Sequence, residues 1–335
     1  MARRRLLAAC ALGAAVGYAP PNRRPPRRTP HYAAPTRDTD DAAAKAAATL
    51  SFVTAAWGTQ HAATKAALDA VGDGHALELT ATRFAIAAVA LFPFRPRDAA
   101  TWKLGAELGL WSFLGFALQT VGLETTTATR SAFLLYLNVK FVPLLELADG
   151  KTLPRGTWAS AFAALTGTLL LASDSADIAG SWAPGDSLSV LAALASACFI
   201  VRLGPASQSA SSAAGLASAT AVATAGLAAL AFLATGAVES TPPPEILVAA
   251  TYLGLVPSAL CGYLQTVAQK TVPPSAAAVV YATDPLWAAF FAYLLLHERL
   301  GPAGLSGAAL IAAAAFGQNL LLWNCDVADE PCEMD

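Results

Sequence analysis

The stretch "SAFLLYLNVKFVPLLEL", residues 131–147, decides what kind of protein this chain forms. It is almost wholly apolar, yet it carries Lys140 at its centre and Glu146 near its end. Its length is close to the ~20 residues with which a helix crosses a bilayer. An ionisable side chain inside such a run is costly, and by default it faces the interior of a helix bundle or a wet cavity.

The composition of the whole chain is that of a membrane protein. Of its 335 residues, 56% are hydrophobic and 13% are charged, whereas an ordinary soluble domain is about 25% charged. The runs are continuously apolar instead of alternating, which indicates helices and not barrel strands. The sequence therefore predicts an all-α polytopic membrane protein. Among the long intervals without Asp, Glu, Lys or Arg are 156–173, 203–238, 246–269 and 300–325.

Ten transmembrane helices are expected, separated by breaks that contain glycine, proline and charged residues. Lysine and arginine concentrate in the loops after the second, fourth, sixth and eighth helices, which agrees with ten spans. The predicted helices are 46–68, 77–94, 104–123, 128–147, 154–173, 186–203, 211–236, 245–268, 274–296 and 301–323.

Residues 1–42 are expected to be a targeting presequence. The chain starts with "MARRRLLAACALGAAVGYAP", a basic start and an apolar core that are typical of a signal peptide. Residues 20–37 contain five arginines and no acid, which suits a transit peptide. Together they favour a plastid envelope membrane of an alga. The alternative is a plain secretory signal followed by a linker. An acidic tail is expected over 324–335.

The chain also contains an internal repeat. "ALQTVGLETT" from Ala117 matches "YLQTVAQKTV" from Tyr263, and "YLNVKFVPLLEL" aligns with "YATDPLWAAFFA". The spacing predicts two copies of a five-helix unit, over 46–173 and 186–323. Because each copy has an odd number of spans, the second inserts upside down. Inverted repeats of this kind build secondary transporters, with the substrate site near the midplane between the copies.

Five segments occur in a characteristic order and spacing along the chain. They are "AAWGTQHAATKAAL" (55–68), "TATRFAIAAVAL" (80–91), "GFALQTVGL" (115–123), "FLLYLNVKFVPLL" (133–145) and "TDPLWAAFFAYLLLHERL" (283–300). Together they resemble the EamA type of the drug/metabolite transporter superfamily. The resemblance implies ten helices in two inverted repeats and the movement of small metabolites across a membrane, with no enzymatic step and no cofactor. At Asp284 the sequence departs from the glutamate that is usual in the family.

The fourth and ninth helices carry the first candidate site residues. Tyr136 and Lys140 are one turn apart and share a face of a continuous helix, and Asn138 aligns with Asp284 in the second copy. We expect Lys140 to line a central cavity, where it binds an anionic substrate group or pairs with Asp284. The alternatives are a fixed ion pair that only orders the bundle, or a lysine that extends to the membrane surface.

The first helix carries a second polar stripe, in which Thr54, Gly58, His61, Lys65 and Asp69 recur at three- and four-residue spacing. The stripe can form a cavity wall. In that case His61 can couple transport to a proton, because its charge changes near neutral pH. The alternative is an ion pair between Lys65 and Asp69 at the helix end.

The remaining candidates are amides and aromatic rings that either contact a substrate or pack between helices. Arg83 is expected to anchor the start of the second helix near the membrane surface. Prolines inside the spans are expected to bend helices beside the site. The amides and rings are Gln119, Gln265, Tyr281, Trp57 and Trp287, and the prolines are Pro143, Pro257 and Pro285.

The expected partners are the lipid bilayer and a small-molecule substrate, with a coupling proton and a homodimer left open. The cavity lysines favour anionic metabolites, whereas walls rich in alanine and tryptophan suit amino acids or aromatic compounds equally well. A nucleic-acid partner is disfavoured, since the only basic cluster lies in the presequence. A channel or a membrane assembly scaffold is the alternative function. An intramembrane serine protease is disfavoured because no histidine follows "GLSG" at 304–307.

Overall fold

The structure of the protein is a computed structural model. Several expected features lie outside the residues that the structure describes, namely most of the presequence, Pro285, the loop with Glu298 and the end of the acidic tail. The side chain of His61 is also outside the description. The described residues are 37–72, 74–126, 131, 134–150, 155–173, 183–235, 242–284, 286–287, 290 and 301–327.

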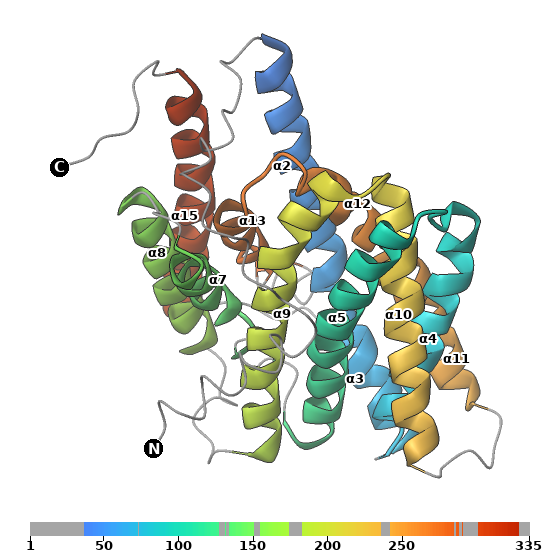
Figure 1. The fold of residues 1–335 in the computed structure, drawn as a ribbon. Helices are drawn as coiled ribbons and strands as arrows, with labels where there is room; N and C mark the ends of the chain where they lie inside the picture. Colours follow the sequence, from blue (N-terminus) through green and yellow to red (C-terminus); the bar gives the residue numbers. More distant parts are fainter. Residues whose placement is uncertain are drawn as a thin grey trace. The chain divides into compact units, whose positions relative to one another are not determined.

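Every regular element in these ranges is a helix, as Figure 1 shows. The first half contains α2 (Arg37–Gly58), α3 (Gln60–Val71), α4 (Ala76–Leu91), η1 (Phe92–Phe94), α5 (Ala99–Thr125), α7 (Asn138–Ala148) and α8 (Arg155–Ser173). The second half contains α9 (Pro184–Ser209), α10 (Ala213–Ala234), α11 (Pro244–Leu253), the π-helical η3 (Gly254–Leu260), α12 (Cys261–Ala268), α13 (Pro274–Tyr281) and α15 (Pro302–Val327).

Five of the described helical segments are long and apolar enough to cross a membrane. Shorter apolar helical segments lie within α8 and α15. The predicted all-α membrane fold is therefore confirmed. The five long segments are Ala76–Phe94, Ala99–Thr125, Pro184–Ser209, Ala213–Ala234 and Pro244–Ala268.

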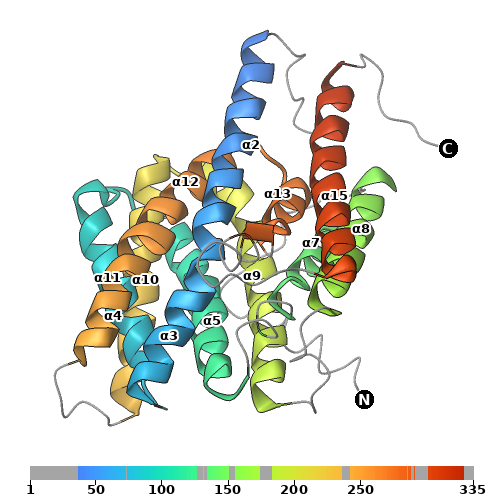
Figure 2. The ribbon, with the colours of Figure 1, turned by 180° about the vertical axis from the view of Figure 1, so that it is seen from behind.

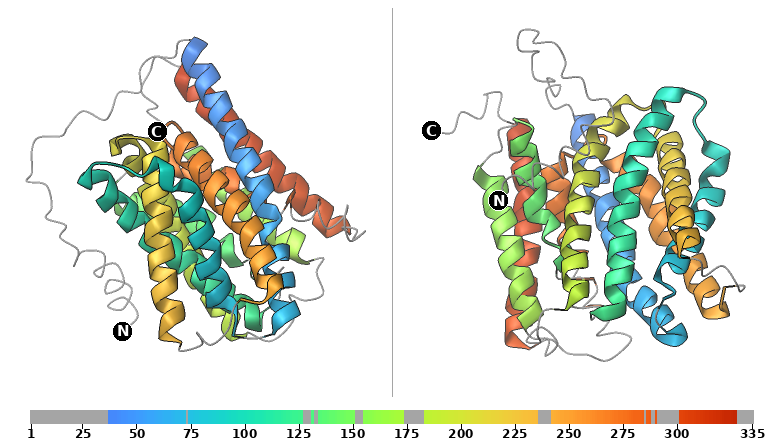
Figure 3. Two further views of the ribbon diagram at one scale, coloured as in Figure 1. Left: turned by 90° about the vertical axis from the view of Figure 1, so that its right-hand side faces the viewer. Right: turned by 60° about the horizontal axis from the view of Figure 1, so that its bottom comes forward.

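The contacts between helices follow the two-repeat pattern. Across the halves, α4 packs against α10, α7 against α13 and α8 against α15 (Figures 1 and 3). In the first half, α5 packs on α9 and α10. In the second half, α11, η3 and α12 occupy the equivalent place and pack on α2, α3 and α4 (Figure 2). Each contact thus has a counterpart in the other half, and the two halves interlock around a pseudo-two-fold axis.

The third span begins at Ala99, five residues before its predicted start, because Asp98 caps it. The Asp98 carboxylate accepts a hydrogen bond from the Thr101 N–H at 2.7 Å, which satisfies one of the free donors of the first turn. Hydrogen bonds from Ser211 and from Thr101 lower the pKa of Asp98 to about 2. This cluster ties the loop before α5 to the loop between α9 and α10.

Two charged residues inside the third and sixth spans pair with each other. Arg202 on α9 donates from Nε to Glu107 Oε1 on α5 at 2.5 Å, and from Nη2 to Glu107 Oε2 at 3.0 Å. The bidentate geometry suits a guanidinium and a carboxylate. The pair therefore joins the two halves where α5 and α9 are in contact.

Small residues allow α5 and α10 to approach closely. Gly105 and Gly109 lie one turn apart on α5, and a Cβ atom added at either position would clash with Ala219 or Ala223 on α10. Glycines with this spacing are a common basis of helix packing in membranes, where no hydrophobic effect drives helices together. The contact between α5 and α10 therefore depends on the absence of side chains at these two glycines.

We expect Gly109→Val to destabilise the protein, because the added methyl groups collide with the α10 backbone and with Ala223. Overpacking of this kind costs about 1–3 kcal/mol. Thermal unfolding in detergent measures the effect. Gly226→Val is the matched control, since a Cβ atom at Gly226 meets open space on the same pair of helices. Equal melting temperatures for the two variants would contradict the close packing.

Candidate functional site

A cavity lies between the two halves. Its volume is about 130 Å³. It contains seven of the ten residues that the sequence pointed to: Trp57, Gln119, Tyr136, Asn138, Gln265, Tyr281 and Asp284. The other lining residues are Gln60, Phe84, Trp111, Ser112, Gly115, Phe116, Leu135, Ser196, Phe199, Ile200, Ala217, Thr220, Ala221, Thr224, Pro257, Ser258, Gly262 and Thr266.

Two helix breaks, at equivalent positions of the two halves, each place a buried polar residue at the cavity. The Lys140 N–H donates to the Leu137 carbonyl at 3.0 Å, and the Leu286 N–H donates to the Thr283 carbonyl at 2.9 Å. Both bonds span three residues instead of four, and the second lies 146 positions (283 minus 137) after the first. Such tight turns interrupt an α-helix. The second residue of each turn is polar and buried: it is Asn138 in the first half and Asp284 in the second.

Three of the polar residues that line the cavity are Asn138, Gln265 and Asp284, and all of them are buried. The Tyr136 hydroxyl donates a hydrogen bond to Asp284 Oδ2. The Asn138 side chain is only 7% exposed, and its Oδ1 atom has no hydrogen-bond partner among the described residues. An unsatisfied buried carbonyl costs roughly 1–3 kcal/mol, so the break before α7 holds Asn138 in a costly position at the cavity.

Gln265 is oriented by a network behind the cavity. Its Nε2 atom donates to Gln269 Oε1 at 3.3 Å, and Tyr281 Oη donates to the same oxygen at 3.3 Å. Gln269 in turn donates to the Ile200 carbonyl at 3.3 Å. One N–H of the Gln265 amide is thus committed to Gln269, which fixes the orientation of the side chain at the cavity.

Two further polar residues of the cavity, Gln60 and Ser258, are both held by Arg83. Arg83 Nε donates to Ser258 Oγ at 2.6 Å, and Arg83 Nη2 donates to Gln60 Oε1 at 2.9 Å. The guanidinium carbon lies 4.5 Å from the ring centroid of Phe116 and 5.4 Å from that of Phe84. Hydrogen bonds to two neutral side chains and contacts with two aromatic rings therefore hold this cation.

The prediction that Arg83 lies near the membrane surface was wrong. Arg83 is 4% exposed, and among the described residues no carboxylate forms an ion pair with it. The helix begins at Ala76, which places Arg83 in its third turn, inside the bundle. The signal was in the sequence, since "TATRFAIAAVAL" is an apolar run with one charge, like the run around Lys140.

Trp57 joins the break in the first span to the π-helical segment of the eighth. Its Nε1 atom donates to the Pro257 carbonyl at 3.1 Å, and its ring lies 5.3 Å from that of Tyr281. Beside it, the Thr59 and Tyr252 hydroxyls are hydrogen-bonded at 2.5 Å. The expected bend at Pro257 is present as η3. Two irregular segments thus meet at the cavity, which is where helix interruptions occur in carriers.

Lys140 does not line the cavity, contrary to expectation. Its Nζ atom lies 5.6 Å from the ring centroid of Phe162, a half-exposed residue of α8 on the outer side of α7. Among the described residues it forms no ion pair, so the expected pairing with Asp284 is absent as well. The reason is the turn at Tyr136–Leu137, which ends the common face that a continuous helix would give Tyr136 and Lys140.

Lys65 is also away from the cavity, and here the alternative interpretation is confirmed. Its Nζ atom lies 2.9 Å from Asp69 Oδ1, one turn further along α3, and donates to the Leu123 carbonyl on α5 at 3.2 Å. The ion pair therefore fixes the end of α3 against α5. For His61 the candidate role stays a prediction, because its side chain lies outside the described part of the chain.

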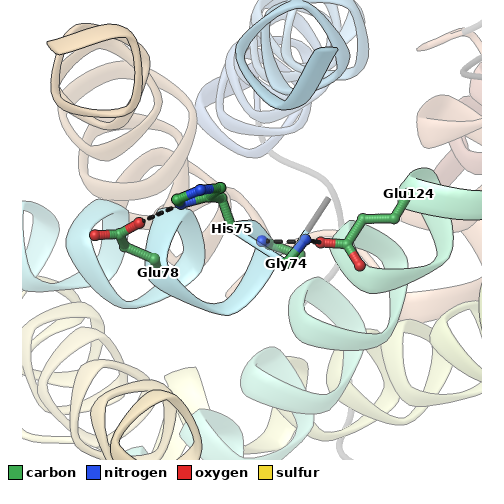
Figure 4. A network of polar contacts seen from close by, with 5 residues as sticks. Gly74, His75, Glu78 and Glu124 are labelled. Atoms are coloured by element: carbon green, nitrogen blue, oxygen red, sulfur yellow. Dashed lines mark hydrogen bonds and ion pairs between the residues drawn. The ribbon is translucent and has the colours of Figure 1, made fainter. Parts of the chain in front are cut away.

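Acidic side chains hold the start of α4, as Figure 4 shows for Glu124 and Glu78. Glu124 Oε1 accepts hydrogen bonds from the N–H groups of Gly74 at 3.0 Å and Ala76 at 3.1 Å, at the start of α4. His75 Nδ1 lies 2.7 Å from Glu78 Oε2. A carboxylate at the N-terminus of a helix stabilises the unpaired N–H groups and the helix dipole. This cluster fixes the start of α4 and therefore the register of Arg83.

Comparisons with known proteins agree with this fold. The model of the EamA-like transporter family matches residues 45–173 and 183–320. A protein of Archaeoglobus fulgidus described as an uncharacterized transporter is 34% identical over 97 residues, which are 29% of this chain and 30% of that protein. A solved crystal structure superposes with a TM-score of 0.67 at 18% identity, covering 85% of this chain and 99% of the other.

The solved structure supports the fold alone, and the archaeal relative is matched over less than a third of its length. The family model, in contrast, matches both halves and most of the chain. The matched ranges contain every residue that lines the cavity. The chain is a multi-pass integral membrane protein, and it belongs to the EamA-like transporter family.

Proposed function

We propose that the protein is a secondary transporter that moves a small organic molecule across a membrane by alternating access, with the central cavity as its substrate site. The observation that carries this proposal is the composition of the cavity wall, which combines residues of both halves. A site between two repeats can be exposed to either side of the membrane when one repeat rocks against the other. The lipid bilayer is the partner that the apolar helices require.

Buried polar groups favour a carrier over the alternative of an assembly scaffold. A scaffold has no use for a side chain such as Asn138, whose buried amide oxygen has no partner in the described part of the protein. The break at Thr59 and the π-helical η3 also give a carrier positions at which helices can bend. In a permanently open channel, water would satisfy the hydrogen bonds of the polar groups in the cavity.

Counterflow in liposomes tests the proposal. Purified full-length protein should accumulate a labelled solute when the vesicles are preloaded with the same unlabelled solute, and the initial rate should saturate. A channel would give flux that is neither saturable nor stimulated by solute on the opposite side. Such a result, or the absence of flux for every solute in a broad panel of small metabolites, would refute the carrier function.

Lys140→Ala should leave transport unchanged, since the ammonium group faces Phe162 on the outer side of α7 and not the cavity. We expect a KM within about twofold of that of the unaltered protein, as for other substitutions away from a site. Lys65→Ala at the end of α3 should behave in the same way. A tenfold rise of KM in Lys140→Ala, measured as counterflow, would return this lysine to the substrate site.

We propose in addition that residues 1–42 direct the protein to a plastid envelope membrane. The support is the order of a basic, apolar signal and an arginine-rich segment without acids. A fluorescent protein fused after residue 42 should enter the plastid of an alga that carries secondary plastids. A fusion that stays in the endoplasmic reticulum would instead favour the secretory alternative.

A further inference from the structure

We propose that the loop between α4 and α5, residues 92–98, binds the headgroup of an anionic phospholipid, with its arginines at the phosphate and its phenylalanine rings among the acyl chains. None of these residues lines the central cavity, so the inference goes beyond the proposed function and does not depend on transport. Exposed rings, cations without ion pairs, a neighbouring helix N-terminus and the position of the acids together support it.

Two aromatic side chains of the loop face away from the protein. Phe92 is 49% exposed and Phe94 is 56% exposed, and both belong to η1, at the end of the apolar segment Ala76–Phe94. Val89, three residues before Phe92, is 74% exposed, so the rings extend the apolar surface of α4. Exposed apolar rings at the end of a span enter the boundary between acyl chains and headgroups. The loop therefore lies at the depth where phospholipid headgroups begin.

Three cations lie beside these rings. The guanidinium carbon of Arg95 is 4.6 Å from the ring centroid of Phe92, a contact that holds a cation against a ring at an exposed site. Arg97 and Lys103 are exposed as well. None of the three forms an ion pair with a described residue. Since a guanidinium binds phosphate through paired hydrogen bonds, the two arginines can hold a headgroup phosphate directly above the rings.

Acids in the same region leave this positive charge uncompensated. Residues 92–103 contain two arginines, one lysine and one acid, so their net charge is +2 (three cations minus one anion). The acid, Asp98, caps α5 by accepting the Thr101 N–H at 2.7 Å. The next acid on α5, Glu107, is paired with Arg202. The excess charge therefore remains at the surface, where it attracts an anionic headgroup.

The N-terminus of α10 adds to the positive potential beside the loop. A Cβ atom added at Gly215 would lie 3.3 Å from Pro96 Cβ and 3.6 Å from the Phe94 carbonyl oxygen, so the loop packs directly on the first turn of α10. That turn is capped by the neutral Ser212 and contains no acidic residue. Figure 1 shows the α4–α5 and α9–α10 connections at the same end of the bundle. The positive end of the α10 dipole therefore adds to the charge of the loop.

The opposite ends of α4 and α5 carry acids instead. Glu78 lies in the first turn of α4 and Glu124 in the last turn of α5, and both hold the start of α4. An anionic headgroup would be repelled there and attracted at the α4–α5 loop.

The rings and the net charge together favour an anionic lipid over other ligands. A soluble anion would leave Phe92 and Phe94 in water, whereas acyl chains cover them and remove their apolar surface from it. A zwitterionic headgroup carries a cation of its own, which Arg95 and Arg97 repel. A phospholipid with a net negative headgroup satisfies both parts of the loop.

Titration of the full-length protein in an uncharged detergent tests the proposal. The probes are dioleoylphosphatidylglycerol and dioleoylphosphatidylcholine, which have the same chains and differ in the charge of the headgroup. Native mass spectrometry measures the affinity of each lipid, and thermal unfolding measures the stabilisation. We expect phosphatidylglycerol to bind about tenfold more tightly or better, since each cation contributes about fivefold, and to raise the melting temperature. Inorganic phosphate and poly-glutamate, which have no acyl chains, should not raise it.

Two double variants locate the site. Arg95→Gln with Arg97→Gln should weaken phosphatidylglycerol about twenty-five-fold, or fivefold for each cation, and leave phosphatidylcholine unchanged. Lys45→Gln with Lys270→Gln is the matched control, because it removes two exposed cations elsewhere on the protein, and it should change the affinity by less than about twofold. All variants share the arginine-rich residues 1–42, whose contribution therefore cancels. Lys103→Gln with Arg97→Gln replaces the first variant if that variant does not fold.

Three results would overturn the inference. Phosphatidylglycerol could bind no more tightly than phosphatidylcholine, or the control variant could lose as much affinity as the arginine variant. Phosphate or poly-glutamate could also stabilise the protein as much as phosphatidylglycerol does, which would indicate a site for soluble anions or for an acidic protein. Because binding is measured without transport, each of these results leaves the carrier function untouched, and a failure of counterflow leaves the lipid site untouched.

Discussion

Gly262→Phe should abolish transport without unfolding the protein. Gly262 lines the cavity on α12, and a Cβ atom added there meets no protein atom within 4 Å. The phenyl group can therefore occupy the cavity itself. A ligand that must share this volume would be overpacked by about 1–3 kcal/mol or more, which corresponds to a ten- to hundredfold loss of affinity. Counterflow in liposomes measures the loss.

Gly226→Phe is the matched control for this variant. Gly226 also lies in a helix, α10, and a Cβ atom there likewise meets nothing within 4 Å, but Gly226 faces outward and does not line the cavity. Both substitutions replace a helical glycine by the same side chain, so their intrinsic effects on helix stability cancel. Full transport by Gly262→Phe, with a melting temperature equal to that of the control, would show that this cavity is not the substrate site.

The repeat explains why so much of the cavity could be predicted from the sequence. Residues that correspond between two inverted copies approach each other at the pseudo-two-fold axis, so aligning Asn138 with Asp284 already indicated a shared location. Gln119 and Gln265 reach the same cavity for the same reason. The helices themselves followed from uncharged runs of sufficient length, and this signal is strong in membranes because the backbone has no alternative there.

The direction of Lys140 could not be predicted, because it depends on a turn that local sequence does not reveal. In a continuous α-helix a residue four positions on lies about 40° away, but in a turn of about 3.0 residues it lies about 120° away. The backbone hydrogen bonds around Asn138 join residues three positions apart, and they therefore rotate Lys140 off the face of Tyr136. Proline was the expected cause of such breaks, yet Pro143 lies inside α7 and the turn precedes it.

The role of Arg83 was missed for a different reason. Its hydrogen-bond partners, Gln60 and Ser258, are 23 and 175 positions away in the sequence. They meet Arg83 only because α4 packs against η3 and α3 starts at the break after Thr59. A sequence pattern reports which residues share a face of one helix, whereas the partners of Arg83 come from two other elements, α3 and η3. The unusual feature that could have indicated it was the charge itself, in the middle of an apolar run.

Arg83→Met should destabilise the protein by roughly 2–4 kcal/mol, the second large effect that we expect. Methionine fills much of the volume, but Gln60 Oε1 and Ser258 Oγ lose their donors in a buried place. The contacts with Phe84 and Phe116 lose their cation as well. Because three elements meet at this side chain, the loss should loosen α3 and η3 relative to α4. Thermal unfolding in a fixed detergent measures the effect.

Lys65→Met is the control, because it removes a cation from a half-exposed pair at the end of α3, and such pairs contribute at most about 1 kcal/mol.

A double-mutant cycle adds a sharper criterion. Once Arg83 is gone, Ser258→Ala should cost less than it does alone, since the serine oxygen no longer has a donor to lose. Strictly additive effects, or an Arg83→Met variant as stable as the parent, would mean that the cation is not held as the structure shows. Arg83→Lys should restore only part of the stability, because one ammonium cannot reproduce the two directed hydrogen bonds of the guanidinium.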